Sequence, residues 1–513
     1  MNKFFNTAGF CNPKHHYMVD PLKRIDNIKE LIEKELYFTI HAPRQTGKTT
    51  FLYAMAKELN GGRNYIALVV SFESAGYGSI SVEQANRTLN RSIFEAACIQ
   101  LPKEFIPEDP QKTPDYNVKS YLNSWCRSLE KPLILFIDEI DALLDDVLIA
   151  VLRQLRDGYQ ARPAGFPSSV ALVGLRDVRD YKAKLRPENV SLGTASPFNV
   201  KSKSIFMGNF TYEEVTELLT QHTEETGQIF SKEVIDEIFR LTEGQPWLVN
   251  ALANQIVNEI LKDDHSKEIT LNLVNQAKIE LIQRRDTHLD SLADKLKEKR
   301  VKTVVQGIIN GDNMVFDILD DDIVYMRDLG LISQKDPIRF ANPIYGEIIP
   351  RIMAYPMQAS LPMEVETSAF EKEDGSLDMD KLLVEFQEFY RENGEIWLER
   401  YEYKESAHHL LLMAFLQRVI NSGGELVREM ALGNQRLDIL VLYKNSRYAM
   451  ELKIYRGERA LEKGKKQLSK YLDKLGLKMG YLVLFDPREK SWEEKIYWTE
   501  EEFQGKKIII VGL

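Results

Sequence analysis

The stretch YFTIHAPRQTGKTT, residues 37–50, decides the fold of the first half of this 513-residue chain. Its first residues are mostly aromatic or β-branched, which is typical of a buried strand. A tight loop follows, and Gly47-Lys48-Thr49 opens a helix. The backbone N–H groups of such a loop, with the positive end of the helix behind them, suit an anion. The stretch therefore predicts a phosphate-binding site.

The loop matches the Walker A pattern except at Ala42, where the pattern has glycine. Alanine does not share the freedom of glycine at positive φ, so we expect Ala42 to be extended. Lys48 would reach the β- and γ-phosphates of ATP, and the Thr49 hydroxyl would hold Mg²⁺. Gly47 and Thr50 complete the predicted nucleotide-binding set.

Residues 133–139 read LILFIDE, an apolar run that ends in two carboxylates. This pattern predicts a central parallel strand that carries both acids to its C-terminal edge. Asp138 would bind Mg²⁺ directly or through water, and Glu139 would orient and activate the attacking water. An Asp-Glu pair about ninety residues after Lys48 is typical of a hydrolytic P-loop ATPase.

Composition sets further limits. The length predicts two to four domains, and 44% hydrophobic with 28% charged residues is ordinary for a globular chain. The net charge of -10 excludes a global nucleic-acid signature, so such binding would need local patches. Three scattered cysteines make no metal or disulfide pattern. Without a signal peptide or an apolar run of roughly 20 residues, we expect a cytoplasmic protein that does not enter the membrane.

Other apolar runs alternate with helical patterns in the first half. Strands are expected at 65–72, 169–175 and 204–207, with helices at 82–100 and 147–158 between them. This alternation predicts a parallel sheet with helices on both faces.

Three positions near this sheet are candidate nucleotide contacts. Arg176, at the end of the 169–175 strand, would sense the γ-phosphate or pair with Asp177. Arg186 is a weaker candidate for an arginine finger that acts on a neighbouring subunit. Tyr17 or His16 would pack on an adenine ring, or their segment would only cover a sheet edge.

A helical region follows the sheet. Thr211 and Glu214 have the spacing of a capping box at a helix start. Gly244-Gln245-Pro246 then opens another helix. It fits a lid in which Pro246 lies near the nucleotide, or it is simply a helix–helix turn with proline at the first helical position.

The first 350 residues resemble the AAA+-like STAND ATPases. Four segments carry the resemblance: the Walker A loop, the Asp138-Glu139 pair, residues 174–177 and residues 244–246. The resemblance implies a nucleotide-dependent lid that acts as a switch and a winged helix after it. The recognition-type helix of that winged helix would start with Asp320, Asp321 and Asp322, and these carboxylates would repel phosphate. We therefore favour a packing role for this part over DNA binding.

The second half contains GNQRLDILVL at 433–442 and YAMELKIY at 448–455. Glu451 and Lys453 are two apart on one strand and so point to the same face, where Asp438 on the neighbouring strand can converge. Two carboxylates would bind Mg²⁺ or Mn²⁺. The lysine would position or activate water, or stabilise charge that develops on phosphorus.

Asp438, Glu451 and Lys453 resemble the signature of the PD-(D/E)XK nuclease superfamily, over roughly residues 377–490. The resemblance implies a metal-dependent nuclease site. It also implies an additional carboxylate, for which Glu405 is the first candidate and Glu429 its competitor.

One predicted helix lies downstream of this signature. Its Gln467 and Tyr471 match a Gln-x-x-x-Tyr pattern that some members of the superfamily place beside the active site. Lysines form a local positive stripe on it that suits a phosphate backbone, unless they are only a solvated face. They are Lys463, Lys465, Lys466 and Lys470.

We expect an α/β multidomain chain with a P-loop parallel-sheet ATPase, a helical lid and a winged helix before a PD-(D/E)XK-type α/β domain. The expected boundaries are 1–209 for the ATPase core, 210–297 for the lid, 298–360 for the winged helix, 361–376 for a linker and 377–513 for the nuclease-like domain. ATP would control a metal-dependent endonuclease that acts on nucleic acid, with DNA as the expected substrate, and homo-oligomer formation is left open. The alternative is a switch ATPase whose C-terminal domain binds nucleic acid or protein without catalysis.

Overall fold

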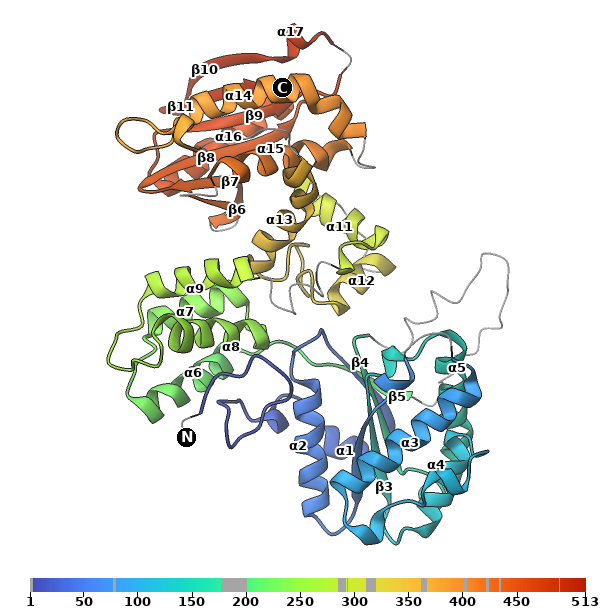
Figure 1. Cartoon of the computed structure of the whole chain (residues 1–513). Coiled ribbons are helices and arrows are strands. Elements are labelled where there is room, and N and C mark those ends of the chain that lie inside the picture. Colours follow the sequence, from blue (N-terminus) through green and yellow to red (C-terminus); the bar gives the residue numbers. More distant parts are fainter. Residues whose placement is uncertain are drawn as a thin grey trace. The chain divides into compact units, whose positions relative to one another are not determined.

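The computed structural model describes residues 3–76, 80–176, 201–284, 292, 294–310, 320–360, 367–399, 404–420, 424–432, 435–488 and 490–513. The chain divides into two compact units. The first comprises Met1–His288 and Leu319–Gln334, and the second comprises Leu289–Ile318 and Lys335–Leu513. Figure 1 labels the elements of both. The five-part division expected from the sequence stays a prediction.

The first unit contains a five-stranded parallel sheet in the order β2-β3-β4-β1-β5. Its strands are β1 (Tyr37–His41), β2 (Ile66–Ser71), β3 (Leu133–Asp138), β4 (Ser169–Gly174) and β5 (Lys201–Phe206). All six residues of β3 and of β4 are buried, as expected for central parallel strands covered on both faces. The parallel sheet predicted from the alternating pattern is confirmed.

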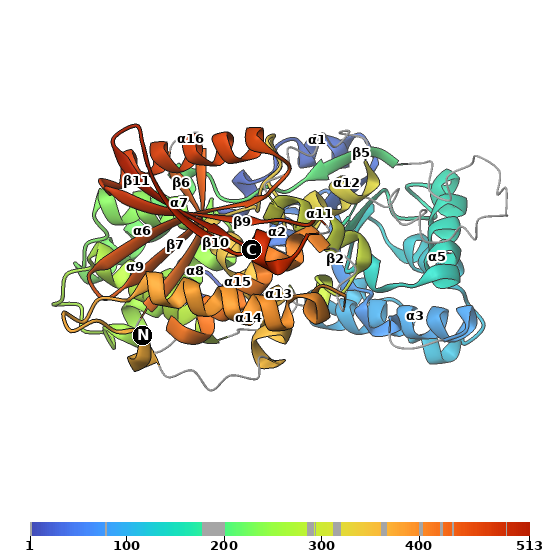
Figure 2. The same ribbon diagram turned by 90° about the horizontal axis from the view of Figure 1, so that it is seen from above.

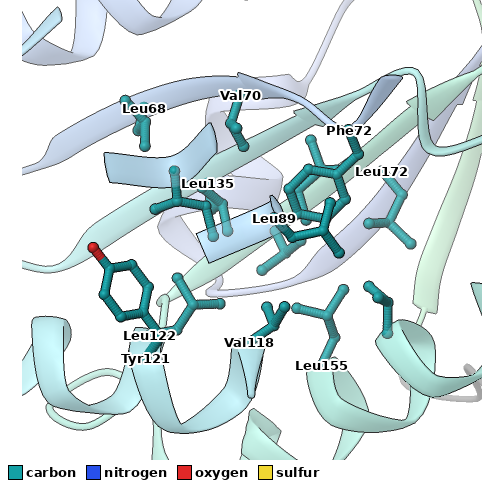
Figure 3. Close-up of a cluster of buried hydrophobic side chains, with 14 of the residues drawn as sticks. Leu68, Val70, Phe72, Leu89, Val118, Tyr121, Leu122, Leu135, Leu155 and Leu172 are labelled. Carbon is teal, nitrogen blue, oxygen red and sulfur yellow. The ribbon is translucent and has the colours of Figure 1, made fainter. Parts of the chain in front are cut away.

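Helices cover both faces of this sheet. They are α1 (Ile28–Glu33), α2 (Lys48–Gly61), α3 (Val82–Gln100), α4 (Val118–Ser128) and α5 (Asp145–Gly158). One core packs β1 to β4 against α1 and α2. The other packs the opposite face against α3, α4 and α5, and Figure 3 shows Leu89, Val118 and Leu155 of these helices facing Leu135 and Leu172 of the strands. These two apolar layers hold the strand ends in place.

A group of helices follows β5. It comprises α6 (Tyr212–Thr226), α7 (Lys232–Thr242), α8 (Pro246–Asn254), a π-helical turn over Gln255–Ile260, and α9 (Leu271–Arg284). The predicted capping box is confirmed, because Glu214 N donates to Thr211 Oγ1 at 3.2 Å and Thr211 N donates to Glu214 Oε2 at 2.7 Å. A short helix, α12 (Asp321–Asp328), also belongs to the first unit.

The second unit contains a six-stranded mixed sheet in the order β10-β11-β9-β8-β7-β6. Its strands are β6 (Gly424–Leu432), β7 (Gln435–Tyr443), β8 (Ser446–Ile454), β9 (Met479–Phe485), β10 (Tyr497–Phe503) and β11 (Lys506–Gly512). The strands β6, β7 and β8 are antiparallel, β9 lies parallel between β8 and β11, and β10 closes the edge antiparallel to β11. The predicted hairpin that carries the Asp and Glu-x-Lys positions is thus β7–β8.

Helices also lie on both sides of this second sheet. The helices of the second unit are α11 (Lys299–Asn310), α13 (Pro343–Ser360), α14 (Met379–Glu399), α15 (Lys404–Ile420), α16 (Glu458–Leu475) and α17 (Trp492–Lys495). Leu468 and Leu472 of α16 pack on β9 and β11, which forms one core. Figure 2 shows α16 on one side of the sheet and α14 with α15 on the other. None of the helices in the described ranges combines the length and the apolar character that crossing a bilayer requires.

Candidate functional site

The predicted phosphate loop lies at the C-terminal end of β1. Ala42 is buried, and its N–H donates to the Gly174 carbonyl at 3.2 Å, which extends the pairing of β1 with β4. The positive φ values of the loop occur at Gln45 (58°) and Gly47 (95°). Gly47 immediately precedes α2, so the loop leads directly into the N-terminus of that helix.

Lys48 is the first residue of α2 and is only 7% exposed. Its Nζ donates to the carbonyl oxygens of Ala42 at 2.9 Å and of Pro43 at 2.8 Å. Burial lowers the pKa of Lys48, and the nearby Glu139 and Asp138 carboxylates oppose that shift. A cation held inside the loop by two carbonyls is placed to exchange them for phosphate oxygens.

The two carboxylates lie at the end of β3, next to the loop. Thr49 Oγ1 donates to Asp138 Oδ2 at 2.7 Å, and Glu139 N donates to Asp138 Oδ1 at 3.0 Å. Burial raises the pKa of Asp138, whereas the Thr49 hydrogen bond lowers it. Burial, with the Asp141 and Asp138 charges, raises the pKa of Glu139 to about 6. A carboxyl of that pKa is suited to accept a proton near neutral pH.

A cavity of about 110 Å³ adjoins the loop. Its lining includes the N-terminal arm around Thr7 and Cys11, the loop with Thr50, and the start of α8 with Pro246 and Trp247. Trp247 Nε1 donates to the Thr7 carbonyl at 2.9 Å, and Cys11 N donates to Thr50 Oγ1 at 3.1 Å. The arm is therefore attached both to α8 and to the loop helix.

Tyr17 borders this cavity but is 1% exposed. Its ring centroid lies 4.8 Å from that of Phe5 and 5.6 Å from that of His222. The ring thus packs the arm onto α6, and its contact with an adenine stays a prediction. His16 lies nearby on the arm, where its Nδ1 accepts from Asn12 N at 2.9 Å.

Arg24 is a functional candidate that the sequence reasoning missed. Its guanidinium donates to the Thr46 carbonyl in the loop and, at 2.5 Å, to the Gly208 carbonyl after β5. It also lies over the Phe210 ring, 4.7 Å from the centroid. These contacts connect the phosphate loop to the start of the helical group. No sequence pattern marks this arginine, because its partners lie 22 and 184 residues away.

Arg176 follows β4, and its guanidinium lies 4.7 Å from the centroid of the Tyr325 ring of α12. Cation–π contact of this kind favours arginine. A role for Arg176 as a phosphate sensor stays a prediction. Asp177 and Arg186 lie outside the residues that the structure describes.

The second cluster forms where β7 meets β8. Lys453 Nζ donates to Glu451 Oε1 at 2.7 Å and lies 3.7 Å from Asp438 Oδ2. Asp438 Oδ2 also accepts from Leu452 N at 2.8 Å. The three side chains predicted to converge are therefore in contact, from two antiparallel strands.

Glu451 is 1% exposed, and its Oε2 is buried without a hydrogen-bond partner among the described residues. Burial and the Asp438 charge raise the pKa of Glu451 to about 8. Burial lowers the pKa of Lys453, but the two carboxylates outweigh it and the net direction is upward. Burying charge in this way carries a cost that is common at functional sites.

In the described part of the chain, the carboxylates of Asp438 and Glu451 are the two that could bind a cation in this cluster. That part contains no group of three or more His, Cys, Asp or Glu side chains able to hold a metal. The side chains of Glu405 on α15 and of Glu429 on β6 lie outside it. The unpaired Glu451 Oε2 fits a cation, which would supply the interaction that this buried oxygen lacks.

The helix α16 crosses this cluster. A Cβ on Gly464 would lie 3.3 Å from Lys453 Cγ and 2.7 Å from Leu482 Cδ1, so the helix lies close against the strands there. Gln467 follows one turn later, and its Oε1 is buried without a partner in the described residues. Tyr471 is buried in the core below.

The predicted basic stripe on α16 is wrong for one lysine. Lys465 is 6% exposed, and its Nζ lies 2.6 Å from Glu501 Oε2 of β10 and 3.3 Å from Glu462 Oε1. Its charge is therefore neutralised within the fold. Lys463, Lys466 and Lys470 are exposed, as expected.

A phosphate loop at the end of β1, with a threonine–aspartate contact to β3 and a glutamate beside it, defines a P-loop ATPase. The chain belongs to the family described as the AAA-like domain, whose model matches residues 14–345. The Walker-type ATPase paby2304 of Pyrococcus abyssi is similar at 14% identity, with a TM-score of 0.47, over 66% of this chain and 98% of that one.

Two further solved structures are similar to this chain. The RuvB Holliday junction branch migration motor of Thermotoga maritima has 17% identity and a TM-score of 0.33, over 61% of this chain and 89% of that one. Domain III of the Thermotoga maritima replication initiation protein DnaA has 12% identity and a TM-score of 0.32, over 52% and 96%. No curated protein sequence matched the chain.

Proposed function

We propose that the ATPase part of this chain controls a metal-dependent nuclease in the second unit, which acts on nucleic acid and in particular on DNA. The observation that carries the proposal is the buried contact of Glu451 and Lys453 beside Asp438. Charged groups are expensive to bury, and a structural role alone would be met as well by apolar residues.

The chemistry of this cluster fits phosphodiester hydrolysis. Asp438 and Glu451 would hold Mg²⁺ or Mn²⁺, with Glu405 as the further carboxylate that the resemblance to PD-(D/E)XK nucleases implies. Such an ion, when bound, activates water and stabilises charge on a phosphoryl oxygen. Lys453 would position the attacking water or stabilise the developing charge, and Gln467 would lie beside it.

In the ATPase part, Lys48, Gly47, Thr49 and Thr50 would bind the phosphates, with Mg²⁺ at Thr49 and Asp138. Glu139 would accept the proton of the attacking water. In this proposal ATP binding moves the α6–α9 lid or assembles a homo-oligomer, as in STAND ATPases. Either change would open or align the nuclease cluster in a cytoplasmic protein.

The contact to nucleic acid would use the exposed lysines of α16, Lys463, Lys466 and Lys470. The positions 463, 466 and 470 follow helical spacing and share one face. In a chain of net charge -10, such a local face is the kind of surface that a phosphate backbone needs.

The test is cleavage of supercoiled, linear and single-stranded DNA and of RNA with Mg²⁺ or Mn²⁺, each with and without ATP. We expect Asp438→Ala to abolish cleavage and Lys48→Ala to abolish the effect of ATP. The control Glu493→Ala, an exposed carboxylate on α17, should leave cleavage unchanged.

The second candidate is a switch ATPase whose second unit binds nucleic acid or protein without cutting it. The pairing of Lys465 with Glu501 favours it, because this removes one cation from the proposed nucleic-acid face. Binding of DNA without cleavage of any substrate would establish this alternative and overturn the nuclease.

A further inference from the structure

The cavity beside the phosphate loop has room for only part of a nucleotide. Its volume of about 110 Å³ is well below the roughly 300–1,000 Å³ of pockets that enclose a whole ligand. Gln45, Thr46 and Gly47 of the loop line it, and so does Asn250 of α8. Phosphates bound at the loop would therefore place the base, a single flat ring system, against α8.

The side-chain amide of Asn250 has one paired and one unpaired polar atom. It is 7% exposed, and its Nδ2 donates to the Pro246 carbonyl at 2.8 Å. That bond sets the orientation of the amide and leaves Oδ1 as the free acceptor. Oδ1 is buried and has no hydrogen-bond partner in the described residues. An acceptor left in this state costs free energy that an incoming donor would recover.

The bases differ in what they offer to such an acceptor. Adenine carries an amino donor at position 6, whereas guanine carries a carbonyl acceptor there. We infer that Asn250 Oδ1 accepts a hydrogen bond from the adenine amino group and thereby selects adenine over guanine. This inference rests on the proposed binding of ATP at the loop. Asn250 is then a specificity-determining residue of the ATP site, and Pro246 orients it.

Asn90 provides a matched comparison within the same unit. It is 1% exposed on α3, its Nδ2 donates to the Tyr116 carbonyl at 2.8 Å, and its Oδ1 has no partner in the described part of the chain. Asn90 does not line the cavity. An unpaired acceptor is therefore no site by itself, and the adjoining cavity is what distinguishes Asn250.

The test is a competition measurement of dissociation constants for ATP, GTP, ITP and purine riboside triphosphate, which has no substituent at position 6. The wild-type chain should bind ATP about tenfold more tightly than the purine riboside nucleotide, the value of one hydrogen bond. Asn250→Leu should bind the two equally and lose most of the preference for ATP over ITP and GTP. Asn90→Leu should keep every ratio.

The outcomes separate this inference from the proposed function. Lys48→Ala should weaken all four nucleotides alike without changing their order. If Asn250→Leu still binds ATP and the ratios of the dissociation constants are unchanged, the inference is overturned and the ATP site is not. A wild-type chain that bound no nucleotide would overturn the ATP site itself. If Asn250→Leu does not fold, the inference is tested by the wild-type affinities for ATP and the purine riboside nucleotide. Equal affinities would overturn it.

Discussion

Thr49 Oγ1 donates a 2.7 Å hydrogen bond to Asp138 Oδ2 across 89 residues of sequence. The strands that carry the two motifs are not neighbours, because β4 lies between β1 and β3 in the sheet. The start of α2 crosses that gap at the C-terminal edge of the sheet. The bond therefore aligns the loop with the acidic strand end before any ligand arrives, which is the kind of preorganisation that catalysis needs.

Glu139→Gln should retain ATP binding and lose hydrolysis by about 10²–10⁴-fold, the usual contribution of a general base. The base acts when deprotonated, so wild-type hydrolysis should rise with pH through about 6, the pKa of Glu139. Phosphate release between pH 5 and 8 measures both the loss of hydrolysis in the variant and the pH dependence of the wild type. As a control, Asp141→Asn removes a charge that raises this pKa, and the profile should move to lower pH. A profile that stayed in place would exclude Glu139 as its origin.

Glu451→Gln should change how stability depends on pH in the second unit. The pKa of Glu451 is raised in the folded chain from 4.5 to about 8, so the folded state binds more protons than the unfolded state in that window. Wild-type stability should therefore fall as pH rises from about 5 to 8, and this fall should shrink in the variant. Urea unfolding at pH 5 and 8.5 measures it, and identical pH dependence in both chains would contradict the assignment.

The same variant tests the cation without any nuclease assay. Mg²⁺ binds the ionised carboxylate, so it should raise the wild-type unfolding temperature more at pH 8.5 than at pH 6. Glu451→Gln should show little of this gain. A Mg²⁺ effect of equal size in both chains would place the ion elsewhere.

Gly244→Ala should destabilise the lid more than Gly227→Ala. Both glycines have positive φ, 71° and 78°, and an alanine there costs roughly 1–2 kcal/mol. A Cβ at Gly244 would also lie 2.0 Å from the Phe210 carbonyl oxygen, whereas nothing lies within 4 Å of one at Gly227. Urea unfolding and ATP titration of the two variants measure the difference. Equal losses would show that the contact with Phe210 relaxes freely.

Arg24→Lys should weaken ATP binding about tenfold while the chain stays folded. A single ammonium cannot reproduce the planar fork that reaches both the Thr46 and Gly208 carbonyls and stacks on Phe210. ATP titration with a fluorescent nucleotide gives the affinity. The neighbouring Lys23 is exposed, and Lys23→Met should bind ATP like the wild type. Unchanged affinity in Arg24→Lys would limit this arginine to a structural role.

Much of the fold was predictable because its patterns are local. The apolar runs that end at Gly174 and Asp138 became central strands of a parallel sheet, and the capping box at Thr211 formed as expected. The period of two along a strand likewise places Glu451 and Lys453 on one face, where their contact with each other and with Asp438 is observed.

Other features had no local pattern. The sequence interpretation assigns Lys465 to a basic stripe, but β10 brings Glu501 to it. Arg24 and Asn250 carry no motif, and their roles depend on where the loop, the end of β5 and the start of α8 meet.

The sequence by itself determined the strands of the parallel sheet, the helix start at Thr211 and the residues of the two clusters, because these depend on side-chain periodicity and on backbone propensities over a few residues. Only the tertiary structure decided which buried polar atoms are satisfied, which lysines are neutralised and where a cavity remains. Those outcomes depend on contacts between segments tens to hundreds of residues apart, such as Trp247 with Thr7. Packing selects these contacts, and no short pattern records them.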